Sequence, residues 1–591
     1  MRSIIKSRVI RIPSPLRIAA LAVSLSSAAL AGCSGADTKM NAGEAVGASA
    51  EDLYGLGSLG AAWPNGQVPV CFADTNAYKN LQAEIPGMLE ASWTAAANIT
   101  FTGFGACPSG NHVTIQWASG SRGWTSSIGY GNPTVTLISD DTSANQQHFH
   151  YEVIHELGHA LGFVHEMKRP DNWVNGVAKQ CGDSPTDSDY PQYSAAPGGI
   201  YLTSTYDYES VMNYCNPAGY PTLLSIGDVS GARQAYGQPT SFNGNRAQDG
   251  RIAVLSRLPN TMEIFWITAN GAVNDSYWYE GGSWNTFQLA PPGSAATTGR
   301  ITAVSRAPNT MEVFFIGADG SVQDKYWYQG SNWGGFALAP AGSASTKGGI
   351  TALARESNTM EVFYVGADGS VQDKYWYQGS NWGGFTLAPA HSAALTASLT
   401  GVARRSNTME VWYVGADGSV QDKYWYQGGN WGSFTLAGAN SASLSGGIAA
   451  VSRYPATMEV WYIGRDGSVQ DKYWYEGGSW NGFALAGAGS ASTSGGLSAI
   501  SLIPSDMTVY FIGQDGSVKD EAWGEGGSWR LSTIDPAGSA KTSDGITAIS
   551  RRPETSELWY TGANGSVQDN YIYPNDFAYS SFQVAGAGSA P

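Results

Sequence analysis

Charged residues are scarce in this 591-residue chain, since Lys, Arg, Asp and Glu together make up only 14% of it. A charge density this low excludes a protein kept disordered by charge repulsion. Basic residues are the scarcer class, and the formal net charge of −16 argues against a nucleic acid or an anionic membrane surface as partner. Beyond the N-terminus, no apolar run is long enough to cross a bilayer.

The chain is rich instead in residues of short strands and tight turns. It contains 75 glycines, and aromatic residues reach 12%, a profile typical of many strands and turns rather than of helical bundles. A chain of 591 residues is too long for one hydrophobic core. We therefore expect two or more domains.

Residues 1–33 have the features of an export signal. Several basic residues precede an apolar run over 18–30, which is short for a membrane span. The run ends in Leu-Ala-Gly-Cys, which resembles a bacterial lipobox and predicts cleavage before Cys33 with lipid on its sulfur. The alternative is an ordinary secretory signal with an incidental cysteine. The protein is thus predicted to be an outer-membrane or cell-surface lipoprotein, or to be secreted. Residues 34–60, rich in Gly, Ala and Ser, then form a flexible tether or a short propeptide.

Cysteine is sparse, and after Cys33 only four remain, at Cys71, Cys107, Cys181 and Cys215. An even number of cysteines in an exported chain predicts two disulfides, and the sequence leaves all three pairings open. The four lack the C-x-x-C spacing of a structural zinc site.

Histidine is also rare, yet three of the seven histidines lie in one H-E-x-x-H-x-x-G-x-x-H motif. On a helix, His155 and His159 share one face and can bind one metal ion. Gly162 can adopt a positive φ that ends the helix and brings in His165 as third ligand. Three protein ligands leave a position open, as in catalytic zinc sites, and Glu156 is placed to take a proton from an attacking water. The alternative is an amphipathic helix with chance histidines.

A second motif, Ser-Val-Met-Asn-Tyr at 210–214, follows the histidines. Together, the two motifs resemble the zinc helix and Met-turn of the metzincins. Glu166, directly after the third histidine, and the S-x-M-x-Y form are similar to the astacin family of zinc endopeptidases. The resemblance covers residues 61–238 and implies an α+β protease domain with one Zn²⁺. It implies that Met212 is the apolar floor of the site, that Tyr214 ligates zinc at rest and then stabilises the oxyanion, and that Glu166 pairs with the activated N-terminus.

Residues 243–591 are periodic. Asp275 and Asp324 lie 49 positions apart, and the aspartate recurs at this spacing through seven units. An arginine repeats as well, at Arg257, Arg306, Arg355, Arg404, Arg453 and Arg551, with Leu502 in the sixth unit. Each unit has the pattern of four strands, and Ala-Asp-Gly-Ser between the middle two is a hairpin signal. Repeated four-stranded sheets of this period predict an all-β seven-bladed propeller.

The repeat also resembles a known family. The string M-E-V-F-x-x-G-x-D-G-S-V-x-D-x-x-W-Y, followed by G-x-W and L-A-P-A-G-S-A, is similar to bacterial seven-bladed lectins that bind fucose and related sugars. The resemblance implies sugar sites between neighbouring blades, with aromatic stacking platforms. Candidates are the strand residues Trp327, Trp376, Trp425 and Trp474 and the turn residues Trp333, Trp382, Trp431 and Trp480. The alternative for each is a scaffold role. Units six and seven depart from the pattern, with Ala522, Gly524 and Ile572 in aromatic positions.

The motifs together predict an exported zinc endopeptidase that cleaves protein or peptide substrates and is carried to fucosylated or related glycans by a multivalent propeller. One alternative is a lectin or adhesin with a vestigial protease domain. Another is a glycosidase propeller, which would need paired carboxylates at one asymmetric site, whereas this chain repeats the same acid in every unit. Membrane attachment is expected only through the lipid anchor, and no nucleic acid is expected.

Overall fold

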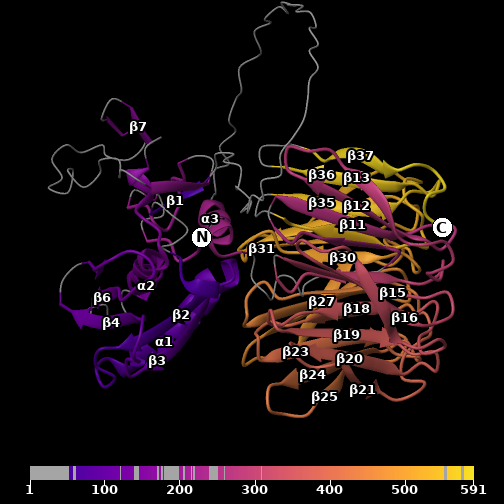
Figure 1. Ribbon diagram of the computed structural model, residues 1–591, viewed down its shortest axis with the longest axis horizontal. Coiled ribbons are helices and arrows are strands. Elements are labelled where there is room, and N and C mark those ends of the chain that lie inside the picture. Colours follow the sequence, from indigo (N-terminus) through magenta and orange to yellow (C-terminus); the bar gives the residue numbers. More distant parts are fainter. Residues whose placement is uncertain are drawn as a thin grey trace, which may run out of the picture. The chain divides into compact units, whose positions relative to one another are not determined.

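The computed structural model describes residues 52–56, 62–119, 122–138, 146–169, 172–174, 177–178, 199–203, 206–214, 216, 220–237, 250–258, 260–307, 309–551, 555–573 and 578–591. Its N-terminal part combines helices with a mixed sheet, and its C-terminal part is all-β (Figure 1). This confirms the predicted fold class. Among these residues, no helix is long and apolar enough to cross a membrane.

The N-terminal part is built on a five-stranded sheet with strand order β3-β2-β4-β6-β5. Its strands are β2 (Gln67–Phe72), β3 (Thr100–Gly105), β4 (Val113–Ala118), β5 (Trp124–Thr125) and β6 (Thr134–Ile138). Four strands are parallel, and β5 pairs antiparallel to β6 as the terminal strand of the sheet.

Within the described part of the chain, three α-helices accompany this sheet. The first, α1 (Lys79–Leu89), continues into a π-turn at Glu90–Thr94. Its apolar residues at every fourth position, Ile85, Leu89 and Trp93, are fully buried, as the helical period predicts. The second, α2 (Gln146–Leu161), carries the first two motif histidines. The third, α3 (Ile226–Tyr236), begins at a capping box in which Ser225 and Asp228 bond each other's backbone N–H groups.

Short elements complete this part of the chain. They are β1 (Asp52–Leu56), β7 (Trp173–Val174), β8 (Val177–Ala178), β9 (Gly199–Thr203) and the 3₁₀ turns Pro64–Gly66 and Glu166–Lys168. β1 pairs antiparallel with β9. Residues 52–56 therefore form a strand, although we expected a flexible tether or propeptide over 34–60.

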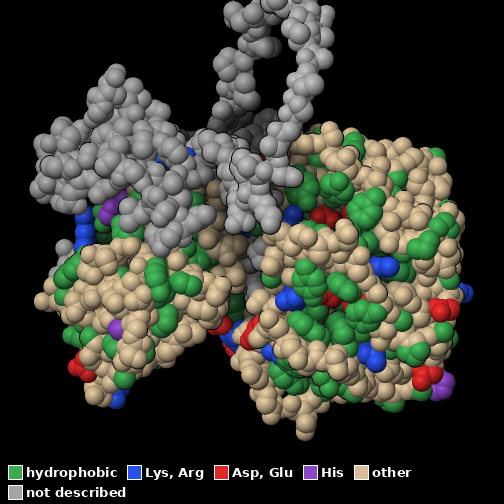
Figure 2. All heavy atoms as spheres, viewed as in Figure 1, with side chains coloured by type: hydrophobic (Ala, Val, Ile, Leu, Met, Phe, Trp, Pro, Cys, Tyr) green, Lys and Arg blue, Asp and Glu red, His purple; other side chains and the backbone are tan. Residues whose placement is uncertain are grey.

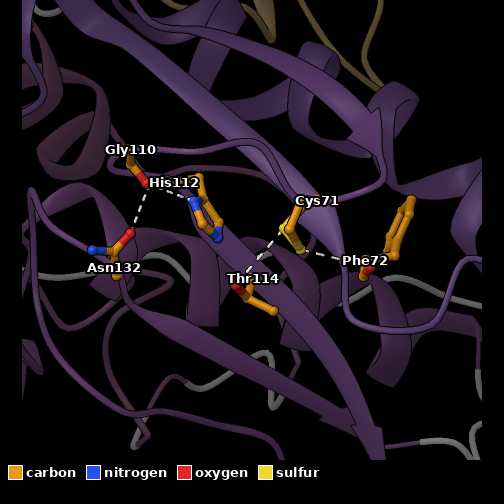
Figure 3. Close-up of a disulfide and its surroundings, with 7 residues drawn as sticks. Cys71, Phe72, Gly110, His112, Thr114 and Asn132 are labelled. Carbon is orange, nitrogen blue, oxygen red and sulfur yellow. Dashed lines mark hydrogen bonds between the residues drawn. A yellow bond between two sulfur atoms is a disulfide. The ribbon is translucent and has the colours of Figure 1, made fainter.

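A disulfide links β2 to the loop after β3 (Figure 3). It joins Cys71 to Cys107, which are 36 positions apart. This bond is one of the pairs that the sequence left open. Cys181 and Cys215, like the predicted lipidation site Cys33, lie outside the described residues.

The C-terminal part consists of seven four-stranded antiparallel sheets, each with its strands in sequence order. The first strand of each sheet lies beside the first strand of the next, and β10 lies beside β34, so that the ring closes. This is the predicted seven-bladed propeller. The strands of blades one to four are Ile252–Leu255, Thr261–Ile267, Val273–Tyr279 and Asn285–Ala290 (β10–β13), Ile301–Val304, Thr310–Ile316, Val322–Tyr328 and Gly334–Ala339 (β14–β17), Ile350–Leu353, Thr359–Val365, Val371–Tyr377 and Gly383–Ala388 (β18–β21), and Leu399–Val402, Thr408–Val414, Val420–Tyr426 and Gly432–Ala437 (β22–β25). Those of blades five to seven are Ile448–Val451, Thr457–Ile463, Val469–Tyr475 and Asn481–Ala486 (β26–β29), Leu497–Ile500, Asp506–Ile512, Val518–Gly524 and Arg530–Asp535 (β30–β33), and Ile546–Ile549, Ser556–Thr561, Val567–Ile572 and Ser580–Ala585 (β34–β37).

Neighbouring blades share hydrophobic clusters, such as the one that joins Phe265 and Ile267 of β11 to Val313 and Phe315 of β15. Every residue of β15 is buried, which explains why its sequence is apolar on both faces. The hairpin between β15 and β16 has the predicted turn, in which Asp319 Oδ1 accepts the N–H of Ser321 at 2.9 Å. The repeat thus encodes both the turn and the contact between neighbouring blades.

Candidate metal centre and inter-blade clusters

The three motif histidines converge as the sequence predicts. His155 and His159 project from α2, which ends at Leu161. Gly162 has a φ of 111° and turns the chain so that His165 approaches the other two. One ring nitrogen from each histidine lies within 4.8 Å of the others, and the Nε2 atoms of His159 and His165 are 3.1 Å apart. The geometry provides three nitrogen ligands on one side of a single metal position.

The outer nitrogens of two rings are fixed by backbone carbonyls. His155 Nδ1 lies 2.8 Å from the Val211 carbonyl oxygen, and His159 Nδ1 lies 2.7 Å from that of Phe163. These bonds place the proton on Nδ1 and leave Nε2 as the metal-binding lone pair. His155 Nε2 is buried and has no hydrogen-bond partner among the described residues. Burial, reinforced by His159, lowers the pKa of His155 to about 3, which keeps this ligand neutral. The set therefore fits a Zn²⁺ ion.

Glu156, beside the first ligand, is 5% exposed. The Thr125 hydroxyl, on terminal strand β5, donates to its Oε2 at 2.7 Å. Burial raises the pKa of Glu156 to about 7, against the effect of this hydrogen bond. One turn earlier, Glu152 Oε1 accepts the Gly123 N–H at 2.7 Å and so fixes the chain leading into β5. Neither Thr125 nor Glu152 was predicted from the sequence, because contacts between distant segments leave no local pattern.

Met212, which the resemblance implies to be the apolar floor of the site, is fully buried. Its sulfur packs so closely on α2 that a Cβ added at Gly158 would lie 2.5 Å from it. The turn is held by Asp228 of α3, whose two carboxylate oxygens accept the Ser210 hydroxyl at 2.6 Å and the Val211 N–H at 2.7 Å. Asp228 is a further residue that the sequence analysis missed.

Tyr214 stands over the histidine cluster. Its ring stacks on His155 with a centroid distance of 5.2 Å and an interplanar angle of 18°, and lies 4.4 Å from the His165 ring. The Arg122 guanidinium lies over the ring of Tyr214, 5.4 Å from its centroid. The structure thus brings Tyr214 to the candidate metal position, next to a cation that the sequence did not indicate.

Glu166 is fully buried behind the site. Its Oε1 accepts the Asp207 N–H at 2.9 Å and lies 3.7 Å from Arg169 Nη1, and its own N–H donates to the Met212 carbonyl at 2.9 Å. Burial raises the pKa of Glu166 to about 8. Glu166 therefore ties the third ligand to the Met-containing turn.

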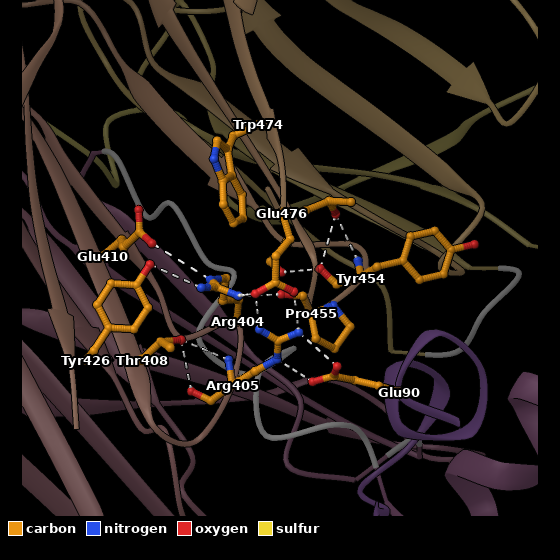
Figure 4. A network of polar contacts seen from close by, with 12 residues as sticks. Glu90, Arg404, Arg405, Thr408, Glu410, Tyr426, Tyr454, Pro455, Trp474 and Glu476 are labelled. Atoms are coloured by element: carbon orange, nitrogen blue, oxygen red, sulfur yellow. Dashed lines mark hydrogen bonds and ion pairs between the residues drawn. The ribbon is translucent and has the colours of Figure 1, made fainter. Parts of the chain in front are cut away.

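In the propeller, the repeated arginines lie at the contacts between blades. We call each group of Arg, Glu and Tyr from one blade with the strand Trp of the next a junction cluster. Figure 4 shows one of them, in which the Arg404 guanidinium lies 5.0 Å from the Trp474 ring centroid and 5.7 Å from that of Tyr426. Arg404 Nε is 3.9 Å from Glu410 Oε1. The Arg and Glu are buried, whereas the Tyr is 45% exposed.

The same arrangement occurs at other junctions, with Arg–Trp distances between 4.8 and 5.1 Å. The paired residues are Arg257 with Trp327, Arg306 with Trp376, Arg355 with Trp425, Arg453 with Trp523, and Arg551 with Trp278. The junction between blades six and seven carries Leu502 for Arg, Thr508 for Glu, Gly524 for Tyr and Ile572 for Trp. Six of the seven junctions therefore have the full set.

The four predicted strand tryptophans all belong to junction clusters. The turn tryptophans have another place: Trp333, Trp382 and Trp431 meet Phe265, Phe314 and Phe363 of the preceding blade edge-on, and Trp480 meets Trp412. All eight are partly buried. Hydrophobic side chains with scattered Lys and Arg are exposed over the propeller (Figure 2). The repeated Arg is visible in the sequence, but its contacts with the Glu of its own blade and the Trp of the next follow only from the fold.

A Glu, an Arg and an aromatic ring together can hold a sugar. The guanidinium donates to hydroxyls, the carboxylate accepts from them, and the ring face packs on the apolar face of the pyranose. Each junction cluster presents these three groups side by side. A cluster is therefore chemically suited to a monosaccharide.

Comparison with known families matches both parts of the chain. Residues 57–227 match the Astacin peptidase family, and residues 261–570 match the Fungal fucose-specific lectin family. Tolloid-like protein 1 of Homo sapiens is 35% identical over 114 residues, which are 18% of this chain and 10% of that protein. Bone morphogenetic protein 1 of Xenopus laevis is 31% identical over 125 residues, which are 17% of each chain. The chain thus spans a small fraction of the length of these relatives.

Among solved structures, the BP39L lectin from Burkholderia pseudomallei superposes with a TM-score of 0.54 at 19% identity, covering 57% of this chain and 99% of that one. At this identity the likeness shows the propeller fold alone. The chain therefore joins an astacin metalloprotease domain to a propeller of the lectin fold. Because the lectin match spans more than half of its residues, the chain belongs to the Fungal fucose-specific lectin family.

Proposed function

We propose that the protein is a zinc endopeptidase whose propeller binds fucosylated or related glycans and so brings the protease to glycosylated substrates. The convergence of three histidine nitrogens beside a buried, hydrogen-bonded Glu156 is the observation that supports peptide hydrolysis most directly. The six junction clusters support glycan binding. Neither half requires the other, so each has its own test.

The proposed hydrolysis follows from the geometry. A Zn²⁺ ion on His155, His159 and His165 would supply Lewis-acid polarisation of the scissile carbonyl. Glu156, oriented by the Thr125 hydroxyl, takes a proton from the attacking water and passes it to the leaving amine. These steps need no other residue to exchange protons.

Two further parts of the site act on the substrate. Tyr214, stacked on the ligand rings, is placed to donate its hydroxyl to the developing oxyanion. Strand β5 ends the sheet, and an extended peptide paired with it would run past Glu156, held mainly by backbone hydrogen bonds. Substrate recognition through the backbone suits a protease that acts on many sequences.

The protease half is tested by casein hydrolysis with the purified mature chain, with and without a zinc chelator, alongside Glu156→Gln. We expect the chelator and the substitution each to abolish hydrolysis, and added Zn²⁺ to restore the chelated enzyme. A chain that contains zinc but cleaves neither casein nor a peptide library would support the alternative, a lectin with a vestigial protease domain.

The glycan half is tested on a glycan array with the Glu156→Gln chain, which should remain intact during the assay. We expect fucosylated or related glycans to be retained and to be displaced by the free sugar. Hydrolysis of an arylglycoside by this chain would instead favour the glycosidase alternative.

Export and lipidation belong to the same proposal. The basic and apolar pattern of residues 1–33 and the lipobox-like ending at Cys33 support an anchored cell-surface or outer-membrane location. Mass spectrometry of the mature N-terminus would detect a lipid on Cys33. A secreted chain that begins elsewhere would contradict the anchor and leave the protease and glycan proposals intact.

A further inference from the structure

The residue two positions after the strand Trp differs between junctions. It is Gln329, Gln378 and Gln427 at the first three junctions, but Glu476 and Glu525 at the next two, and Glu280 where the ring closes. This position lies at the exposed end of a junction cluster, since Glu476 and Glu525 are 47% and 42% exposed. The junction clusters are therefore not equivalent.

Among the contacts of the described residues, the carboxylate lies against the arginine of the cluster at two junctions. Glu476 Oε1 lies 3.6 Å from Arg404 Nη1, and Glu525 Oε2 lies 3.3 Å from Arg453 Nη1. Each arginine thus has two carboxylates, its buried Glu and this exposed one. The junction arginine donates to a backbone carbonyl of the next blade at both kinds of junction, as Arg355 Nη1 does to Ser406 at 2.8 Å and Arg404 Nη1 does to Pro455 at 2.9 Å. At the Glu junctions this Nη1 also lies against a carboxylate, which a sugar hydroxyl would have to displace (Figure 4).

Each exposed carboxylate is held in place by the residue that follows the arginine. Arg405 donates to both oxygens of Glu476 at 2.9 and 2.8 Å, and it also donates to Glu90 Oε2 at 2.8 Å. Tyr454 donates its hydroxyl to Glu525 Oε2 at 3.2 Å. At the first three junctions this following residue is Leu258, Ala307 or Glu356, and the facing residue is Gln. The carboxylate and the residue that holds it therefore occur together.

We propose that Glu476 and Glu525 are internal competitors that weaken sugar binding at their two junctions, so that the propeller has strong and weak glycan sites. This inference rests on the proposed glycan function. A neutral sugar must displace the carboxylate from the guanidinium to reach its donors. The cost is that of a partly exposed ion pair, which corresponds to about a two- to fivefold loss of affinity.

The test isolates the two junctions. In the full chain with Glu156→Gln, alanine replaces Arg257, Arg306, Arg355 and Arg551. Methyl α-L-fucoside is then titrated by calorimetry, with and without Glu476→Gln and Glu525→Gln. We expect the two glutamine substitutions to raise affinity about two- to fivefold, because glutamine cannot form the ion pair. Salt screens that pair, so we also expect salt to strengthen binding only while the two glutamates are present.

A matched control uses the chain with all six junction arginines intact, again with Glu156→Gln. Gln378→Glu introduces a carboxylate at a junction where the residue after the arginine is Ala307, which has no side chain that could hold it. We expect a smaller loss of fucoside affinity at that junction than Glu476 and Glu525 cause at theirs. If the alanine background unfolds, the titration is made in this intact chain, where the two glutamine substitutions should convert two weak sites into strong ones. Unchanged affinities and salt dependence in a chain that binds fucoside would overturn this inference. A chain that binds no fucoside and retains no glycan on the array would overturn the proposed glycan function itself.

Discussion

The candidate metal centre is built from one short stretch of chain, whereas each junction cluster is divided between two blades. His155, His159 and His165 are placed by one helix and one turn. Arg404 and Trp474, by contrast, meet only because the ring brings neighbouring blades together. Among the described residues, a cluster of three histidines occurs once, whereas the junction cluster occurs at six of seven junctions. One substitution can therefore disable the candidate metal centre, whereas one substitution in the propeller alters only one of six similar clusters.

The largest effect on activity is expected at the candidate metal centre, where no second residue can replace Glu156. Glu156→Gln removes the proton acceptor while keeping the shape of the side chain and its place beside Thr125. Casein hydrolysis should fall by about 10²–10⁴-fold, as expected for loss of a general base. Zinc content, measured by atomic emission, and glycan binding should stay as in the unmodified chain. Residual activity within a few fold of the parent would mean that another group takes the proton.

Removing the disulfide should destabilise the protease part and leave the stability of the propeller unchanged. Replacing Cys71 and Cys107 with serine opens the link between β2 and the loop after β3. We expect the protease part to lose about 3 kcal/mol of unfolding free energy, since the unfolded chain gains entropy. Calorimetry should show a lower melting temperature for one transition and no change in the propeller transition. A shift in both transitions would show that the two parts unfold together.

A single junction cluster should matter far less than the metal centre. Arg355→Ala removes the donor beside Trp425 and leaves the other five clusters intact. We expect the fucoside stoichiometry to fall by one site, and retention on a glycan surface to weaken modestly because avidity depends on the remaining sites. Leu502→Ala, at the incomplete junction, is the matched control and should change neither quantity. Loss of all binding in Arg355→Ala would contradict independent sites.

The features that depend on residues close together in the chain could be predicted from the sequence. The H-E-x-x-H-x-x-G-x-x-H motif predicted the helix, the turn at Gly162 and the convergence of three histidines. The repeat likewise predicted seven four-stranded blades, because each hairpin is a local structure with a strong turn signal.

Contacts between distant segments could not be predicted in the same way. Thr125 reaches Glu156 from a separate strand, and Asp228 supports the Met-containing turn from α3. In the propeller, the repeated Arg was visible, but its partner Trp lies in the following blade. A repeat shows which residues recur, and only the closed ring shows which of them meet.

The smallest predicted effect is a pH dependence that should distinguish the propeller from the protease part. Burial raises the pKa of Glu263, Glu312 and Glu410 to about 7, against the opposing effect of the neighbouring arginines. The folded propeller therefore holds these protons more tightly than the unfolded chain does. This stabilisation is fully present below the ordinary Glu pKa of about 4.3 and is lost as pH rises through about 7.

The propeller melting temperature should thus fall between pH 5 and pH 8, by roughly a few degrees. Differential scanning calorimetry of the full chain checks this, with the triple variant Glu263→Gln, Glu312→Gln and Glu410→Gln as control. Glutamine does not titrate, so the variant should lose part of the pH dependence. A melting temperature that rises with pH would mean that the arginines keep these carboxylates ionised in the fold. The junction clusters would then hold buried ion pairs, and a sugar would meet a carboxylate that is charged throughout this range.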